Sequence, residues 1–410
     1  MKADLSRVLN RALINEFKTA YRGSTVQSFV IWCFLKYCLD TKLCKDTKEG
    51  LDNITNVLTD FYSKTIDTNH VEKLFTDIDE MYGQDRLLSR MSSFFREETK
   101  FHEDIIDVIS QLNFKANLEE TLDLIKASIY NLQNNLGGRY TFGGTSIGIS
   151  RTASLLLKVE EKDSFADFCC GTGLSTLEIV KDLNTRVELS DISPDARATS
   201  LMVLIMFGYK NIRISDFEPG NKEKASKVFA DLPILPDMVN EKMSVSTKYH
   251  ADFLIKAKNM IETEGKAVLV VPGKYLFSAV DAVRYSRDVL VIEEYLDAVI
   301  ALPYRFEGTA ALANLIVLKK GTKNPIFIDA SKFESNSNGI EQIVDIYNNR
   351  TEVNGVSKVL SKDEILAQGT SFSPARYTIK ETTVNVDKEL EETEEKLNVA
   401  LAHLNELMNK

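Results

Sequence analysis

A glycine-rich turn joins a short apolar run to a helical segment near the middle of the chain, and few folds accommodate this order. Residues 165–169 form the apolar run, residues 174–183 have the spacing of an amphipathic helix, and the turn is Asp167-Phe168-Cys169-Cys170-Gly171-Thr172-Gly173. Glycine lets the backbone approach a ligand closely, and the following helix presents its positive N-terminus. The segment therefore predicts the first strand, turn and helix of an α/β sheet, with a plain tight turn as the alternative.

Apolar runs continue to alternate with helical segments over residues 136–380. Amphipathic stretches such as residues 194–207 lie between the runs. This alternation is typical of a mostly parallel sheet that is covered by helices on both faces and binds ligands at the carboxyl ends of its strands. Residues 313–318 form a further strand, which we expect near an edge of the sheet. The other expected strands are residues 186–190, 228–230, 267–271 and 296–301.

Helical patterns dominate both ends of the chain. Residues 26–37 are apolar on nearly all sides, as in a helix buried within a bundle, and residues 118–132 have helical spacing. Beyond Val384, leucines 390, 397, 401, 404 and 407 form a narrow apolar seam, which indicates a helix that packs on a partner or folds back on its own domain. We expect an all-helical N-terminal domain at residues 1–135, an α/β domain at 136–380 and a C-terminal partner-binding helix at 381–410.

Charge and cysteine content limit the functions to consider. Five scattered cysteines, at positions 33, 38, 44, 169 and 170, are expected to be reduced, and neither they nor the four histidines have metal-ligand spacing. A net charge of −10 disfavours DNA binding by this chain alone, because neutralising phosphates requires lysine and arginine surfaces. The sequence contains neither a membrane-length apolar stretch nor a signal peptide, which predicts a cytoplasmic protein without membrane contact.

Acidic residues follow the next two expected strands. Asp191 can accept both ribose hydroxyls of an adenosine, while Ser193 and Pro194 would equally suit the start of a helix. Asp216 could accept an adenine amino hydrogen, or lie in a surface turn. Together with the acidic glycine turn, which suits a cationic ligand, these residues predict a Rossmann-like class I S-adenosylmethionine (SAM) dependent methyltransferase fold. The expected cofactor-binding residues of these segments are Asp167, Cys169, Gly171, Thr172, Gly173, Asp191, Ile192, Asp216 and Phe217.

With this order of motifs, the chain resembles the modification subunit of type I restriction-modification systems, a DNA adenine-N6 methyltransferase. The resemblance extends over nearly the whole chain. The segment Gly137-Gly138-Arg139-Tyr140-Thr141 is similar to the family's segment before the first strand, which implies that Tyr140 and Thr141 bind SAM near its carboxylate; Phe142 replaces the usual proline. The later segments that follow the family's order are residues 270–272, 276–277, 298–303, 306–309, 315–318 and 372–377.

The resemblance also locates a catalytic motif, and there this chain departs from the family. The family has Asn-Pro-Pro-aromatic after the fourth strand, whereas this chain has Asp231-Leu232-Pro233-Ile234. Asp231 and the adjacent carbonyl can accept hydrogens from the target amino group. Leu232 loosens the turn, and Ile234 removes a ring whose stacking on a flipped base is worth ~1–3 kcal/mol. Either another aromatic substitutes, or the segment is only a loop. The candidate aromatics are Tyr249, Tyr275, Phe277 and Tyr304.

Three functions are compatible with these residues. The resemblance implies the SAM-dependent adenine-N6 methyltransferase subunit of a type I-like complex on double-stranded DNA, with a separate specificity subunit and a restriction subunit left open. Such a chain would form a homodimer or a hetero-oligomer. The alternative, favoured by Ile234, is a catalytically weak or inactive SAM-binding or scaffold subunit. A methyltransferase for proteins or small molecules is disfavoured by the family-like N-terminal domain.

Overall fold

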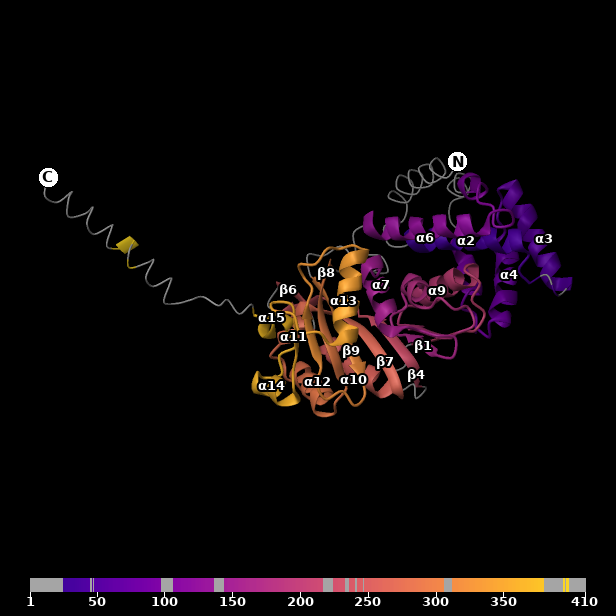
Figure 1. Ribbon diagram of the computed structural model, residues 1–410. Coiled ribbons are helices and arrows are strands. Elements are labelled where there is room, and N and C mark those ends of the chain that lie inside the picture. The colour runs from indigo at the N-terminus through magenta and orange to yellow at the C-terminus, as the bar shows by residue number, and fades with distance from the viewer. Residues whose placement is uncertain are drawn as a thin grey trace, which may run out of the picture.

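A helical region precedes a large sheet in this protein (Figure 1). The computed structural model describes residues 25–44, 46, 48–96, 106–135, 144–216, 224–232, 236–239, 242–245, 247–305, 312–379, 394, 396 and 397. In the helical region one helix is buried on nearly all sides, as its apolar sequence predicts, while the next two bury a single face. The elements of this region are α2 (Thr25–Thr41), α3 (Lys48–Ser63), α4 (Thr68–Met81), the 3₁₀ helix η1 (Ser89–Arg96) and α6 (Leu118–Asn135).

The sheet has nine strands in the order β3-β2-β1-β4-β7-β9-β8-β10-β11. Neighbours from β3 to β7 run parallel, as do β8 and β10. The mostly parallel sheet predicted from the alternating pattern is therefore confirmed. Its strands are β1 (Ser164–Asp167), β2 (Arg186–Asp191), β3 (Ile212–Asp216), β4 (Ala225–Asp231), β7 (Ile261–Pro272), β8 (Leu296–Arg305), β9 (Leu312–Lys319), β10 (Ile326–Asp329) and β11 (Ser357–Val359); a separate hairpin comprises β5 (Pro236–Val239) and β6 (Lys242–Val245).

The expected edge position of residues 313–318 is wrong. Strand β9, which contains them, lies between β7 and β8 and runs antiparallel to both, with Val268 opposite Val317 and Val299 opposite Ile316. A strand with neighbours on both sides and buried faces reads as a continuous apolar run, which explains its composition.

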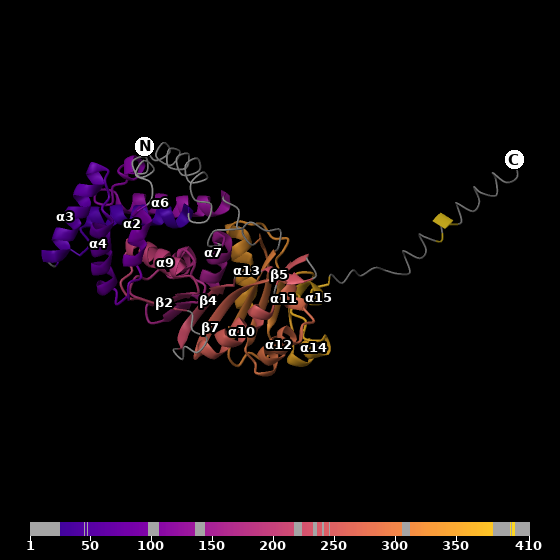
Figure 2. The same cartoon turned by 180° about the vertical axis from the view of Figure 1, so that it is seen from behind.

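Helices cover both faces of the sheet, and the two faces bury alternate residues of each strand. In β4, Phe229 packs with one apolar cluster while Val228 and Ala230 pack with the other. Figure 2 shows α10 and α12 along the side of the sheet away from α9. The helices of this part are α7 (Ile147–Leu157), α8 (Leu174–Ile179), α9 (Pro194–Met206), α10 (Lys248–Met260), α11 (Gly273–Phe277), α12 (Asp281–Ile292), α13 (Ser337–Asn349), α14 (Lys362–Ala367) and α15 (Pro374–Tyr377).

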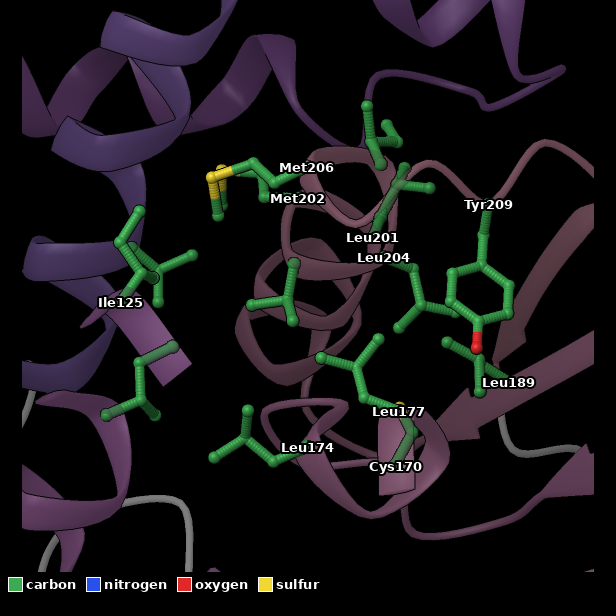
Figure 3. Close-up of a cluster of buried hydrophobic side chains, with 14 of the residues drawn as sticks. Ile125, Cys170, Leu174, Leu177, Leu189, Leu201, Met202, Leu204, Met206 and Tyr209 are labelled. Carbon is green, nitrogen blue, oxygen red and sulfur yellow. The ribbon is translucent and has the colours of Figure 1, made fainter. Parts of the chain in front are cut away.

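The helical region and one sheet face share a single apolar core. Ile125 of α6 lies across from Met202 and Met206 of α9, and the same cluster continues down to Leu189 of β2 (Figure 3). Helix α9 is buried over most of its circumference because it lies between the sheet and the helical region. The helical region therefore packs directly above the first strands of the sheet, close to the glycine turn.

Two findings concern sequence features outside the sheet. No helix among the described residues is both long and apolar enough to cross a membrane. The expected partner-binding helix at residues 381–410 lies outside the described residues, apart from positions 394, 396 and 397. The proposed division at residues 135 and 380 thus stays a prediction.

Candidate functional site

Asp167 is the last residue of β1 and is fully buried. Its carboxylate accepts hydrogen bonds from the Thr176 hydroxyl at 3.0 Å and from the Cys169 backbone N–H at 3.2 Å. The pKa of Asp167 is raised to about 7, chiefly by burial and in smaller part by the nearby carboxylates of Asp191 and Asp231, while the two hydrogen bonds act in the opposite direction. The acidic residue predicted for the glycine turn is therefore a buried carboxylate that pays a desolvation cost when it ionises.

Both glycines of the turn have a backbone conformation that favours glycine, and Gly173 is also closely packed. Gly171 and Gly173 have φ of +52° and +79°, a region that favours glycine. A β-carbon at Gly173 would also lie 2.9 Å from Leu204 Cδ1 and 3.2 Å from the Ser200 Cα of α9. The Ser200 hydroxyl donates to the Gly171 carbonyl at 2.8 Å. The turn is thus pressed onto α9, which holds it in one conformation.

Asp191 ends β2 and is bonded to the same turn. Its carboxylate accepts from the Gly171 N–H at 3.1 Å and from the Ser193 N–H at 2.9 Å. Ser193 also caps α9, since its hydroxyl accepts from the Ala196 N–H at 3.3 Å. The expected helix start at Ser193 and Pro194 is therefore confirmed, while the ribose contact of Asp191 stays a prediction. Ile192 between them is 84 % exposed, which leaves an apolar side chain free beside Asp191.

Asp216 ends β3, at the same end of the sheet as Asp191. Its carboxylate forms an ion pair with Arg197 of α9, and Arg197 also donates to the Asp191 carbonyl at 2.7 Å. Arg197 thus links the ends of β2 and β3. Phe217, which is also an expected cofactor-binding residue, lies outside the described residues, as do Tyr140 and Thr141.

Asp231 is the last residue of β4, next to β1 in the sheet. Burial raises the pKa of its carboxyl group to about 6, while a hydrogen bond from the Thr145 side chain acts in the opposite direction. Leu232 is fully buried, and Pro233 and Ile234 lie outside the described residues. The structure therefore brings Asp167, Asp191 and Asp231 together at the carboxyl ends of β1, β2 and β4.

The structure adds three residues to this site: Thr145 and Gln133, which sequence reasoning missed, and Tyr249, which was one of the candidate aromatics. Thr145 lies in the segment between α6 and α7 and contacts Asp231. Gln133 of α6 donates to the Thr172 hydroxyl at 3.2 Å. Tyr249 of α10 lies close enough to Cys169 and Asp191 that their charges add to the effect of burial in raising the pKa of its hydroxyl. The only available signal was the aromatic type of Tyr249, because all three contacts join segments distant in sequence.

The other candidate aromatics lie in different surroundings. Tyr275 is fully buried, and its hydroxyl is 2.8 Å from the Ser286 hydroxyl, so it belongs to the core. Phe277 is 65 % exposed. Tyr304 of β8 packs its ring against Gly148 at the start of α7, so closely that a β-carbon at Gly148 would be 2.4 Å from it. Tyr249 is the aromatic residue whose surroundings include the glycine turn and Asp191.

Comparison with known proteins defines the class of this fold. A methyltransferase subunit of a type I restriction-modification system from Streptococcus thermophilus superposes with a TM-score of 0.69 at 15% identity, covering 90% of this chain and 99% of that chain. A structure solved in work on complex assembly and conformational transition of the type I R-M system gives 0.66 at 16% identity, covering 99% and 98%. The fold is that of class I SAM-dependent methyltransferases, as predicted from the sequence.

Sequence comparison shows which methyltransferases this chain is similar to. The family model for N-6 DNA Methylase matches residues 227–385. The methylase subunit of the type I restriction enzyme MpnII from Mycoplasma pneumoniae is 30% identical over 168 residues, which cover 38% of this chain and only 30% of that relative's length. These findings confirm the resemblance to modification subunits of type I restriction-modification systems that the sequence motifs indicated.

Proposed function

We propose that this chain is the SAM-dependent adenine-N6 DNA methyltransferase subunit of a type I-like restriction-modification complex. The observation that carries the proposal is the convergence of Asp167, Asp191 and Asp231 around the glycine turn, at the carboxyl ends of neighbouring strands. Ligands of doubly wound sheets bind at this position. The match of residues 227–385 to the N-6 DNA Methylase model supports the same reaction.

The buried carboxylates fit a cationic, adenosine-containing cofactor. Asp167 is fully buried beside two other carboxylates, and the groups that favour its ionised form are a hydroxyl and a backbone N–H. A ligand with positive charge would compensate this carboxylate, which a phosphate would not. Asp191, at the end of β2, would accept ribose hydroxyls, and the exposed Ile192 would offer an apolar surface to an adenine ring.

Asp231 is the proposed acceptor for the target amino group. SAM, when bound, supplies a methyl group on a cationic sulfur. The carboxylate of Asp231 would accept a hydrogen of the adenine amino group, and thereby increase lone-pair density on its nitrogen. The hydrogen bond from Thr145 would hold the carboxylate in place. The base must leave the duplex to reach this position.

The partners follow from the charge of the chain and from its similarity to type I subunits. A net charge of −10 suits a subunit that meets double-stranded DNA within a complex, where a specificity subunit provides basic surface and sequence recognition. We propose that residues 381–410 bind this partner, and that a restriction subunit can join the complex. We propose that the complex acts on DNA in the cytoplasm.

The proposal can be tested in two steps. Calorimetric titration of the full chain with SAM should give micromolar binding, and Asp191→Ala should weaken it strongly. Methylation of DNA by the complex with its specificity subunit should then be measured as N6-methyladenine formed. SAM binding without methylation would support the scaffold alternative instead. Absence of SAM binding, both alone and in the complex, would contradict the cofactor assignment.

A further inference from the structure

Gln133 connects the helical region to the glycine turn. It lies in the last turn of α6 and is 3 % exposed. Its side-chain Nε2 donates to the Thr172 hydroxyl at 3.2 Å, and Thr172 itself is 4 % exposed. The contact is therefore a buried hydrogen bond between an N-terminal helix and the middle of the turn that is proposed to hold the cofactor.

The amide of Gln133 is confined in this position. A β-carbon on Gly144 would lie 2.4 Å from both Cδ and Nε2 of Gln133, and 2.6 Å from its Oε1. The absence of a side chain at Gly144 thus leaves just enough space for the amide. Glycine here has an ordinary backbone conformation, so the close approach of Gln133 is what requires it.

The second polar atom of this amide has no hydrogen-bond partner among the residues that the structure describes. Oε1 of Gln133 is buried and accepts no hydrogen bond from any residue that the structure describes. A buried acceptor without a donor is unfavourable and rare in native proteins, and a bound ligand is one reason for its presence. A ligand that pairs with this oxygen would have to offer a hydrogen-bond donor close to Thr172.

We propose that Oε1 of Gln133 accepts a hydrogen bond from the amino group of the methionine part of SAM. This inference rests on the proposed function, which places the cationic cofactor at the glycine turn. Helix α6 then forms part of the cofactor site, although it belongs to the helical region. The ion pair of Lys126 with Glu178 of α8, at 2.7 Å, holds the same helix over the turn from a position seven residues earlier.

The test compares two ligands that differ in the amino-acid part. S-adenosylhomocysteine carries the amino group, whereas 5′-methylthioadenosine lacks the whole amino-acid end. In calorimetry with the full chain, Gln133→Met should weaken S-adenosylhomocysteine binding about tenfold. Binding of 5′-methylthioadenosine should stay within about twofold of the wild type, which also shows that the variant is folded. Equal losses for both ligands, or no loss for either, would overturn the inference.

Two further variants complete the experiment. Gln133→Glu keeps the size of the side chain and places a carboxylate near the ammonium, so it should retain more affinity for S-adenosylhomocysteine than Gln133→Met; a larger loss would contradict the assignment to the amino group. Lys126→Met alters the same helix without touching Thr172, and should affect the binding of both ligands alike.

If the wild type binds neither ligand, the proposed function fails together with this inference. If it binds both and Gln133→Met behaves like the wild type, this inference alone fails.

Discussion

Two clusters of buried polar groups lie at opposite ends of the sheet and differ in how their charges are balanced. At the carboxyl ends of the strands, Asp167 lies near Asp191 and Asp231, and the charges of these two carboxylates add to its cost of ionisation. At the amino end of β8, Asp297 is 3 % exposed but pairs with the Arg350 guanidinium and accepts from the hydroxyls of Tyr347 and Thr322.

The second cluster compensates its own charges. Lys266 of β7 is desolvated, which lowers its pKa to about 8, while the charge of Asp297 acts in the opposite direction. Its ammonium group donates to the Leu156 carbonyl at 3.0 Å and lies 5.1 Å from the centre of the Tyr347 ring. Burial of charged groups alone therefore does not identify a functional site. Burial dominates the pKa of Asp167 and of Asp231, and the groups that oppose it are hydrogen-bond donors rather than basic side chains, so these two carboxylates are the better candidates for binding a cation.

The largest effect is expected at Asp231. Asp231→Ala should reduce methylation by the assembled complex about 1000-fold, since it removes the proposed acceptor for the amino hydrogen. SAM affinity, measured by calorimetry, should change less than threefold. Asp231→Asn keeps an acceptor oxygen and matches the first residue of the family's motif, so it should retain activity. Unchanged methylation by Asp231→Ala would show that the acceptor lies elsewhere.

Removing the acid of the compensated cluster should instead affect folding. Asp297→Ala is expected to lower the free energy of unfolding by about 3 kcal/mol, because Arg350 and Lys266 would lose their buried counter-charge. Urea unfolding measures this loss, with Asp345→Ala on the exposed face of α13 as a control expected to cost less than about 0.5 kcal/mol. A loss below about 1 kcal/mol for Asp297→Ala would mean that the two clusters do not differ as described.

A smaller change is expected for cofactor binding through Asp191. Asp191→Ala should weaken SAM binding about 30-fold, or ~2 kcal/mol, because it removes both the proposed ribose contact and the hydrogen bond that holds Gly171. Calorimetry provides the measurement. Asp195→Ala, in the first turn of α9 and four residues away, serves as the control. Similar losses for both variants would point to a general effect on α9 rather than to a binding role of Asp191.

The smallest effect concerns pH. Asp167 has a folded-state pKa of about 7, above its ordinary value of 3.8, so between these values the folded state binds more protons than the unfolded state. Stability from this group is therefore present at low pH and lost as the pH rises towards 7. Relative to Asp167→Asn, the wild type should lose about 1 kcal/mol between pH 5 and pH 6 in urea unfolding. Parallel curves for the two proteins would contradict the uncompensated burial of Asp167.

Local sequence patterns were sufficient for much of the fold and part of the site. Asp167, Asp191, Asp216 and Asp231 could each be assigned to the end of a strand, because an acidic residue after an apolar run is a local signal. Their proximity followed from the parallel arrangement, which brings the carboxyl ends of strands to one edge. The contacts of Thr145, Gln133 and Tyr249 were not predictable in this way, since each joins the site to a segment outside the strands.

The parallel sheet, the glycine turn and the acidic residue types of the site could be predicted from sequence, because apolar periodicity and residue type are local signals. The position of β9 in the middle of the sheet, rather than at its edge, is known only from the folded structure, since an apolar run carries no information about which strands will flank it. Packing likewise decided which buried charges are compensated. Asp297 meets Arg350, 53 residues away, whereas Asp167 meets two other carboxylates, and this difference arises from the approach of distant segments in the folded chain.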